Sequence, residues 1–339
     1  MPSPRSAGCT TFLLACLSMS TASFAGDNAR FRIDEENDAF ASDRDRHYTQ
    51  GLSLTYTSAD LASDNALNDL FNGVAEATPI FANGGKRQYQ LSLGQSLFTP
   101  DNTRSFEPLP NQRPYAGWLY TGLGLMQEMS DGEGLENLEL QLGVIGPMAL
   151  GRQAQNGYHH MAGIRVSHGW SHQLKNEPGL VLSYERKARS TLWRSEDVAL
   201  DVIPEAGVSL GNVFTYAQAG GMVRFGRNLS ADYGSYRIRP GMSGTTWFDS
   251  DRMDGDLGWY LFAGVQGRAV LRDITLDGNT FRDSQSVDRK KTVGDMVVGL
   301  SVFWSDAVRA DLSVIERTRE FKGQNGRDRF GVLALSFRL

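Results

Sequence analysis

The sequence predicts an all-β protein, a closed antiparallel transmembrane β-barrel of twelve strands with a short helix in an extracellular loop. Apolar and polar residues alternate over many segments, such as 51–57 and 137–144, and this period of two indicates strands with two different faces. Beyond residue 25, no uninterrupted apolar run approaches the roughly 20 residues that a spanning helix needs. The mean hydropathy of −0.34 suits a barrel, because alternate residues of its strands face water.

Twelve segments are expected to be strands, and an even number returns a single chain to the side of the membrane where it began. They are 30–38, 47–58, 87–98, 116–127, 136–146, 178–189, 198–209, 213–225, 258–272, 291–304, 307–318 and 329–339. Two gaps, 59–86 and 226–257, are long for turns on the periplasmic side. Either a hairpin is hidden in them or they carry extra structure, and 66–75 predicts a short amphipathic helix.

The C-terminal segment favours a barrel over a soluble β-sandwich, an alternative that the alternation by itself leaves open. Its apolar residues share one face, and the pattern runs to the last residue; they are Leu333, Leu335, Phe337 and Leu339. Aromatic residues near strand ends are typical of a girdle at the membrane interface. The expected members are Tyr48, Trp118, Tyr120, Trp259, Tyr260 and Trp304.

The N-terminal segment predicts export. Residues 1–25 have a positive residue, a short apolar stretch and a small-x-small cleavage site, which together are typical of a cleaved signal peptide. A lipoprotein signal is the weaker alternative. Residues 26–339 would form the barrel and contain no cysteine, because Cys9 and Cys16 both lie in the leader. A formal net charge of −5 argues against a nucleic-acid partner.

Chemically useful residues collect in the odd-numbered gaps between predicted strands, and strand parity places all of these gaps at one end of the barrel. All five histidines lie in or beside such gaps. Asn37 and Asp38 follow the first strand and offer oxygen ligands for a hard cation, although a solvated strand end explains them equally well. His159 is a candidate general base, since the pKa of histidine lies near neutrality; polar surface is the alternative.

Three further patterns are weak. His168 and His172 have the spacing of two zinc ligands on a helix, but there is no obvious third ligand. Residues 207–211 match G-x-S-x-G, yet both flanks alternate as strands, so Ser209 is interpreted as a hairpin residue rather than a nucleophile. The acidic run 249–256 resembles a calcium loop with the wrong ligand spacing, and a solvated turn is the better interpretation.

Several short motifs, in this order, resemble the outer-membrane lipid A 3′-O-deacylase family (LpxR type). They are Glu36-Asn37-Asp38, Tyr48-Thr49-Gln50-Gly51, Arg113-Pro114-Tyr115-Ala116-Gly117-Trp118, Val144-Ile145-Gly146-Pro147, Gln155-Asn156-Gly157-Tyr158-His159, Trp170-Ser171-His172-Gln173-Leu174 and Ser209-Leu210-Gly211-Asn212-Val213-Phe214-Thr215-Tyr216. The resemblance spans most of the chain after the leader. It implies a twelve-stranded barrel in the outer membrane and a Ca²⁺-dependent hydrolase that removes the 3′-linked acyloxyacyl group of lipid A.

The resemblance also implies roles for individual residues. Asn37 and Asp38 match the family's Asn-Asp pair, which makes Asp38, with Asn37, the Ca²⁺ ligand. The catalytic set implied by the family is His159 as the base, with Asn37, Thr49 and Gln155. A basic residue after the third strand contacts substrate in the family, and Arg104 is the best match. At two positions where family members can have an acidic residue, this chain has Ala39 and Arg165. These two differences bear on how many metal ions bind and on which substrate is chosen.

These residues suggest ester hydrolysis by water that His159 activates, with the cation and Thr49 at the oxyanion and Gln155 orienting the base or the water. Arg104 and Arg113 suit the phosphates of lipid A. The expected protein is an outer-membrane monomer whose site faces outward and whose partner is lipid A or lipopolysaccharide. The alternatives are a barrel without enzymatic activity, acting as a narrow pore or a lipopolysaccharide- or cation-binding structural protein, and a serine phospholipase.

Overall fold

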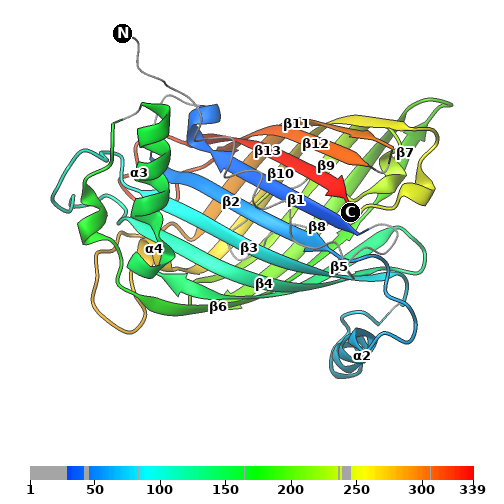
Figure 1. The fold of residues 1–339 in the computed structure, drawn as a ribbon, viewed down its shortest axis with the longest axis horizontal. Helices are drawn as coiled ribbons and strands as arrows, with labels where there is room; N and C mark the ends of the chain where they lie inside the picture. Colours follow the sequence, from blue (N-terminus) through cyan, green and yellow to red (C-terminus); the bar gives the residue numbers. More distant parts are fainter. Residues whose placement is uncertain are drawn as a thin grey trace, which may run out of the picture.

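The computed structural model describes residues 29–339 except 42–45, 83, 164, 236, 239–245 and 306. The predicted signal peptide and both cysteines lie outside the described residues. The described chain forms a single antiparallel sheet that closes on itself as a barrel (Figure 1). No helix in the described ranges is long and apolar enough to cross a membrane.

Strands that follow one another along the chain pair with each other, except β6 and β7, and two pairings close the ring: β1 with β13 and β6 with β8. The strands are β1 Arg30–Asn37, β2 His47–Thr57, β3 Arg87–Thr99, β4 Ala116–Glu128, β5 Gly134–Ile145, β6 Glu177–Ala188, β7 Ser190–Arg194, β8 Ala199–Gly211, β9 Phe214–Arg227, β10 Leu257–Asp273, β11 Thr292–Trp304, β12 Val308–Arg317 and β13 Asp328–Arg338. Every predicted strand end lies within two residues of the observed one.

The short strand β7 explains how thirteen segments make a barrel of twelve strands. β6 pairs with β8 as far as Lys187, opposite Glu205, and β7 continues along β8 from Ser190, opposite Val202. β6 and β7 therefore occupy one place in the ring. The prediction of a closed twelve-stranded barrel is confirmed, and the soluble sandwich is not, because a sandwich would leave sheet edges that are absent from the ladder described here.

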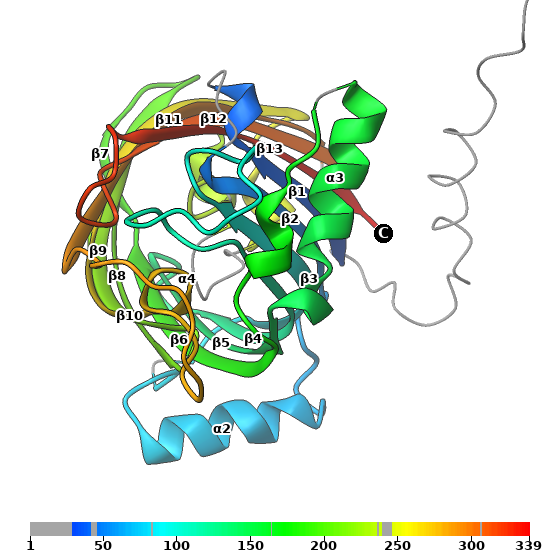
Figure 2. The same cartoon turned by 90° about the vertical axis from the view of Figure 1, so that its left-hand side faces the viewer.

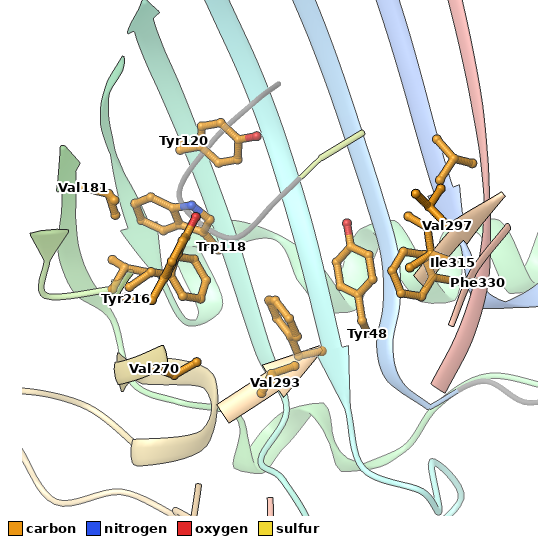
Figure 3. Close-up of a cluster of buried hydrophobic side chains, with 14 of the residues drawn as sticks. Tyr48, Trp118, Tyr120, Val181, Tyr216, Val270, Val293, Val297, Ile315 and Phe330 are labelled. Atoms are coloured by element: carbon orange, nitrogen blue, oxygen red, sulfur yellow. The ribbon is translucent and has the colours of Figure 1, made fainter. Parts of the chain in front are cut away.

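The two faces of the wall differ as expected for a membrane barrel. Outward positions in the middle of the wall carry exposed apolar side chains such as Leu52, Leu93 and Leu261, while inward positions carry buried polar ones. The predicted aromatic girdle is largely wrong, because most of its members point inward and are buried: Tyr48, Trp118, Tyr120 and Tyr260. Figure 3 shows three of these rings in the lumenal cluster. Trp304 is exposed.

The barrel has two different ends. The α3 rim carries the loops that follow β1, β3, β5, β8, β10 and β12. It holds α3 Gly151–Ala162, α4 Ile274–Asp277 and the 3₁₀ turns η1 Asp38–Phe40, η2 Pro147–Ala149 and η3 Gly169–His172. The terminal rim carries the remaining loops and the ends of β1 and β13 from which the chain termini lead, together with α2 Leu67–Ala77, close to the helix predicted at 66–75. Figure 1 shows α3 and α2 at opposite ends.

The long connection from β9 to β10 is described at 228–235, 237–238 and 246–256; many of these residues are buried inside the barrel, and together they are called the lumen segment. It holds η4 Leu229–Ala231 and η5 Ser250–Arg252. From the terminal rim it reaches across the lumen, where the N–H of Ile238 donates to Glu36 Oε1 at 2.7 Å and Tyr233 donates to Glu128 Oε1 at 2.7 Å. The long gap predicted here therefore carries extra structure rather than a missed hairpin.

Candidate active site

A polar patch interrupts the apolar outer wall where β1, β2 and β3 approach the α3 rim. Along β1, outward Ile33 is followed by outward Glu35 and Asn37; along β2, Leu52 is preceded by Gln50. Gln50 donates to Glu35 Oε1 at 2.9 Å, and Asn37 donates to the same oxygen at 3.4 Å. Polar groups at lipid-facing positions are costly unless they serve a purpose, so this patch is a candidate site.

Asn37 and Asp38 form the turn at the end of β1. Asn37 caps η1, its Oδ1 accepting the N–H of Ala39 at 2.9 Å. Asp38 Oδ2 accepts the N–H of Arg46 at 2.7 Å, which ties the start of the β1–β2 loop to its end. Both side chains are only 5% exposed. Asp38 also lines a cavity of about 310 Å³ at the barrel mouth, together with Arg46, Tyr48, Glu316 and Arg327 to Arg329.

Thr49 is the extra residue of a β-bulge in β2. The register with β3 shifts between Tyr48, opposite Phe98, and Gln50, opposite Leu97. Bulges re-aim a side chain and are common beside active sites. Here the bulge directs Thr49 Oγ1 to Thr99 Oγ1, 2.7 Å away at the end of β3, so the threonine is held near the outer wall.

Helix α3 lies against the outside of the wall rather than over the lumen, as Figure 2 shows from this end of the barrel. Its first residue, Gly151, is in close contact with Trp170, since a Cβ at this position would lie 2.6 Å from the Trp170 ring. Ala154 and Trp170 pack with outward-facing Leu97 of β3. The helix ends at Gly163, whose φ of 70° suits a glycine C-cap.

Gln155 and His159 share the buried face of α3, because residues four apart align on a helix. Gln155 is 1% exposed and accepts a 2.6 Å hydrogen bond from Trp170 Nε1. His159 is 4% exposed, and its Nδ1 lies 2.8 Å from the carbonyl oxygen of Arg165. A carbonyl only accepts, so Nδ1 carries the proton and Nε2 of the neutral ring carries the lone pair. The main chain of Arg165 therefore orients the base.

The two arginines predicted to contact phosphate, Arg104 and Arg113, lie in different environments. Arg104 is exposed on the β3–β4 loop, which contacts the α3–β6 loop through Thr103, whose carbonyl accepts the N–H of His168 at 2.9 Å. Arg113 is fully buried and donates to Glu320 at 2.9 Å and to Thr275 at 2.6 Å. Its guanidinium is committed inside the barrel, so the structure gives no support to Arg113 as a phosphate contact.

Charged groups tie the loops of the α3 rim together. His47, buried at the start of β2, lies between Asp328, 2.7 Å from Nδ1, and Asp101, 3.2 Å from Nε2. The His47 contact, with help from Arg46, holds the pKa of Asp101 below its ordinary value despite partial burial. Burial raises the pKa of Glu320, but Arg317 and Arg113 outweigh it and leave this pKa below its ordinary value. Three loops thus meet through ion pairs.

The donors present fit a hard cation in chemistry but are few. The carboxylate of Asp38 and the carboxamide of Asn37 are adjacent oxygen donors of the kind that Ca²⁺ prefers. Within the described ranges, no three His, Cys, Asp or Glu side chains gather as a ligand cluster. Water and substrate would therefore have to supply most of the shell. The same finding counts against zinc at His168, which instead stacks on Phe106 with 4.3 Å between ring centroids.

The weak motifs are resolved as structure. Ser209 is buried in β8 and accepts a 3.0 Å hydrogen bond from Ser183. Asp249 pairs with Lys86 at 2.9 Å and Arg252 at 3.1 Å instead of forming a calcium loop. Glu35 and Gln50 are the polar-patch residues that have no assigned role in the predicted site. A polar residue at a lipid-facing position of a strand was the signal that could have found them.

The structure brings the predicted catalytic residues to one rim. Asn37 and Thr49 lie at the rim ends of β1 and β2, and Gln155 and His159 lie on α3. Thr49 bonds the end of β3, Leu97 of β3 packs on Trp170, and Trp170 bonds Gln155, so contacts connect the wall with the helix. The arrangement offers an oriented imidazole, a hydroxyl and oxygen ligands beside the membrane-facing wall.

Comparisons with known proteins found a matching family model and several similar solved structures. A family model described as "Outer membrane protein LpxR" matches residues 11–339. LpxR from Salmonella typhimurium superposes with a TM-score of 0.72 at 24% identity, covering 91% of this chain and 100% of that chain. The β domain of the Bordetella autotransporter BrkA gives a TM-score of 0.45 at 10% identity, over 92% and 98% of the two chains. No curated protein matches in a sequence search.

Proposed function

Because the chain belongs to the LpxR family of outer-membrane proteins, we propose that it is a Ca²⁺-dependent hydrolase that cleaves the 3′-linked acyloxyacyl ester of lipid A in the outer leaflet. Family membership makes it a lipid A-modifying protein of the outer membrane. The bond cleaved, the cation and the outward orientation of the α3 rim belong to the proposal.

The observation that carries the proposal is the placement of His159. Its ring is buried on α3, its tautomer is fixed by the Arg165 carbonyl, and the helix lies against the lipid-facing wall. A base there meets a substrate whose acyl chains lie in the membrane. A site in the lumen would not, since the barrel wall separates the lumen from the acyl chains.

In the proposed reaction, His159 Nε2 takes a proton from water as the water oxygen adds to the ester carbonyl carbon. The carbonyl π electrons move onto its oxygen and form an oxyanion. When the tetrahedral intermediate collapses, the bond to the sugar oxygen breaks, and protonated His159 returns its proton to that oxygen. The products are a fatty acid and a free 3′-hydroxyl, so atoms and charges balance.

The remaining residues position the reacting groups. The hydroxyl of Thr49, aimed by the bulge, is the proposed donor to the oxyanion. Gln155, whose amide oxygen accepts from Trp170, is the proposed group that orients the base or the water. Asp38, with Asn37, would hold Ca²⁺, which when bound supplies positive charge for the developing oxyanion. Arg104, exposed near α3, is the proposed phosphate contact.

Mass spectrometry of lipid A tests the proposal. The purified barrel in mixed micelles should convert lipid A to a product lighter by one acyloxyacyl group, and EDTA should abolish this conversion until Ca²⁺ is restored. Unchanged lipid A spectra with Ca²⁺ present would refute the proposed reaction. Full activity in EDTA would refute the cation while leaving the hydrolysis.

A further inference from the structure

A second cavity on the α3 rim is lined by positive charge. It measures about 1070 Å³ and lies between the rim ends of β10 and β11 and the β12–β13 loop. Its charged lining residues are all cationic: Arg268, Lys290, Arg319 and Arg327. None of its described lining residues is a carboxylate. Such a cavity attracts anions, because low-dielectric walls strengthen the field of like charges.

Arg268 gives this cavity a fixed, buried cation. Its side chain is 4% exposed, and Nη1 lies 3.3 Å from Asp295 Oδ2 without forming a hydrogen bond to a described residue. Asp295 is already shared, since Arg317 donates to it at 2.9 Å and Arg237 at 3.3 Å. Glu320, a second carboxylate that interacts with Arg268, is shared in the same way with Arg317 and Arg113. Asp295 and Glu320 therefore face four guanidiniums, and the positive charge of the cluster is left incompletely balanced.

The backbone near Lys290 and Arg319 is held in place by hydrogen bonds between the two loops. The N–H of Lys290 donates to the carbonyl of Glu320 at 2.7 Å, and a β-bridge pairs Arg289 with Phe321. Both side chains are exposed, and neither has a carboxylate partner among the described residues. The nearby exposed Lys322 differs, because Asp288 lies 3.1 Å from its amine.

This cavity adjoins the site proposed above. Arg327 lines both the cavity of Arg268 and the smaller cavity that contains Asp38. One polar surface thus runs along the α3 rim from the candidate cation ligand to the cationic cavity. A glycolipid at the active site would present its sugars to this rim while its acyl chains stay against the wall.

We propose that the cationic cavity binds anionic groups, phosphate or carboxylate, on the saccharide part of the lipid substrate. The inference rests on the proposed function for the identity of the lipid, but the binding itself does not require hydrolysis. Guanidinium and ammonium donors pair strongly with both kinds of oxyanion. The cavity would then select lipids with a charged saccharide over those whose sugars are neutral.

The binding test uses the full-length barrel in detergent and the saccharide of lipopolysaccharide freed of acyl chains by alkali, which cannot be hydrolysed. Titration calorimetry compares the wild type with K290Q/R319Q and with K322Q as the matched control. We expect the Kd to rise about tenfold or more in the double variant and not in K322Q. Equal Kd values for all three proteins, or no binding by the wild type, would overturn the proposal.

The two sources of negative charge are separated by further saccharides. One lacks the phosphates of lipid A and retains the carboxylate sugars of the core; the other retains the phosphates and lacks the core. The one that the wild type binds more tightly than the double variant identifies the group in the cavity. We expect the saccharide that keeps both anionic groups to bind, and a saccharide from which both have been removed not to bind. Because this readout needs no catalysis, an inactive enzyme would refute the hydrolase proposal and leave this one standing.

Discussion

The Asp232 cluster and the cationic cavity differ in how their charges are balanced. Toward the terminal rim, Asp232 of the lumen segment is buried and bonded to Arg224, Arg309 and Tyr260. At the α3 rim, Arg104, Lys290 and Arg319 are exposed without a carboxylate partner among the described residues, and Arg268 shares Asp295 with two other guanidiniums. Saturated ion clusters hold a structure together, whereas incompletely matched charges beside a cavity remain available to a ligand.

This contrast predicts that substitutions in the candidate active site change activity, and that substitutions in the ion pairs of the lumen segment and of the rim loops change stability. The four variants below are arranged from the largest expected effect to the smallest. The variants at His159 and Asp232 are each paired with a residue of the same type in a different environment, and the variant at Thr49 is paired with a conservative substitution.

His159→Ala should lower kcat by about 10²–10⁴-fold, because a positioned general base contributes about this factor. The folded barrel should persist, as shown by slower gel migration after heating. His160 follows on the same helix and is exposed, so His160→Ala should keep near-full deacylation. A His159→Ala protein that turns over lipid A at the wild-type rate would remove the base from the mechanism.

Asp232→Asn should lower the free energy of unfolding by about 3–5 kcal/mol, since it leaves two buried guanidiniums without their shared carboxylate. Urea unfolding in lipid vesicles measures the loss. Asp254, 91% exposed in the same lumen segment, provides the control, and Asp254→Asn should be nearly neutral. Loss of activity without loss of stability in Asp232→Asn would contradict the division between the active site and the ion pairs.

Thr49→Val should lower kcat by about 10²-fold, the usual cost of removing one oxyanion donor. Thr49→Ser keeps the hydroxyl and should recover most of the rate. If valine and serine variants behave alike, the threonine acts through packing at the bulge instead. Steady-state kinetics on lipid A in micelles separates the two results.

Asp101→Asn should have a small effect that depends on pH. The folded-state pKa of Asp101 lies below its ordinary value of 3.8, so the ionised carboxylate stabilises the fold above that pH. This contribution disappears as the pH falls through the folded-state pKa. The Tm difference between wild type and Asp101→Asn should therefore shrink from pH 5 toward pH 3. A difference that stays constant over this range would show that the ion pair with His47 contributes nothing.

The sequence by itself determined the strands, because the period of two is a local property of each segment. It also determined that His159, Asn37 and Thr49 lie at one end, since the parity of the strands fixes which gaps share a side. The local period of two also showed that the G-x-S-x-G match at Ser209 is not a nucleophile turn, because both flanks alternate as strands.

Only the tertiary structure decided which way side chains point at the rim and which charges are already paired. Tyr48 and Trp118 looked like girdle residues but face the lumen, and Arg113 looked like a phosphate contact but bonds Glu320, a residue 207 positions away. The polar patch of Glu35 and Gln50 became evident only once the structure showed which face of each strand points outward. The burial of a side chain and the pairing of its charge depend on contacts with distant segments of the chain. A local sequence pattern therefore cannot predict them.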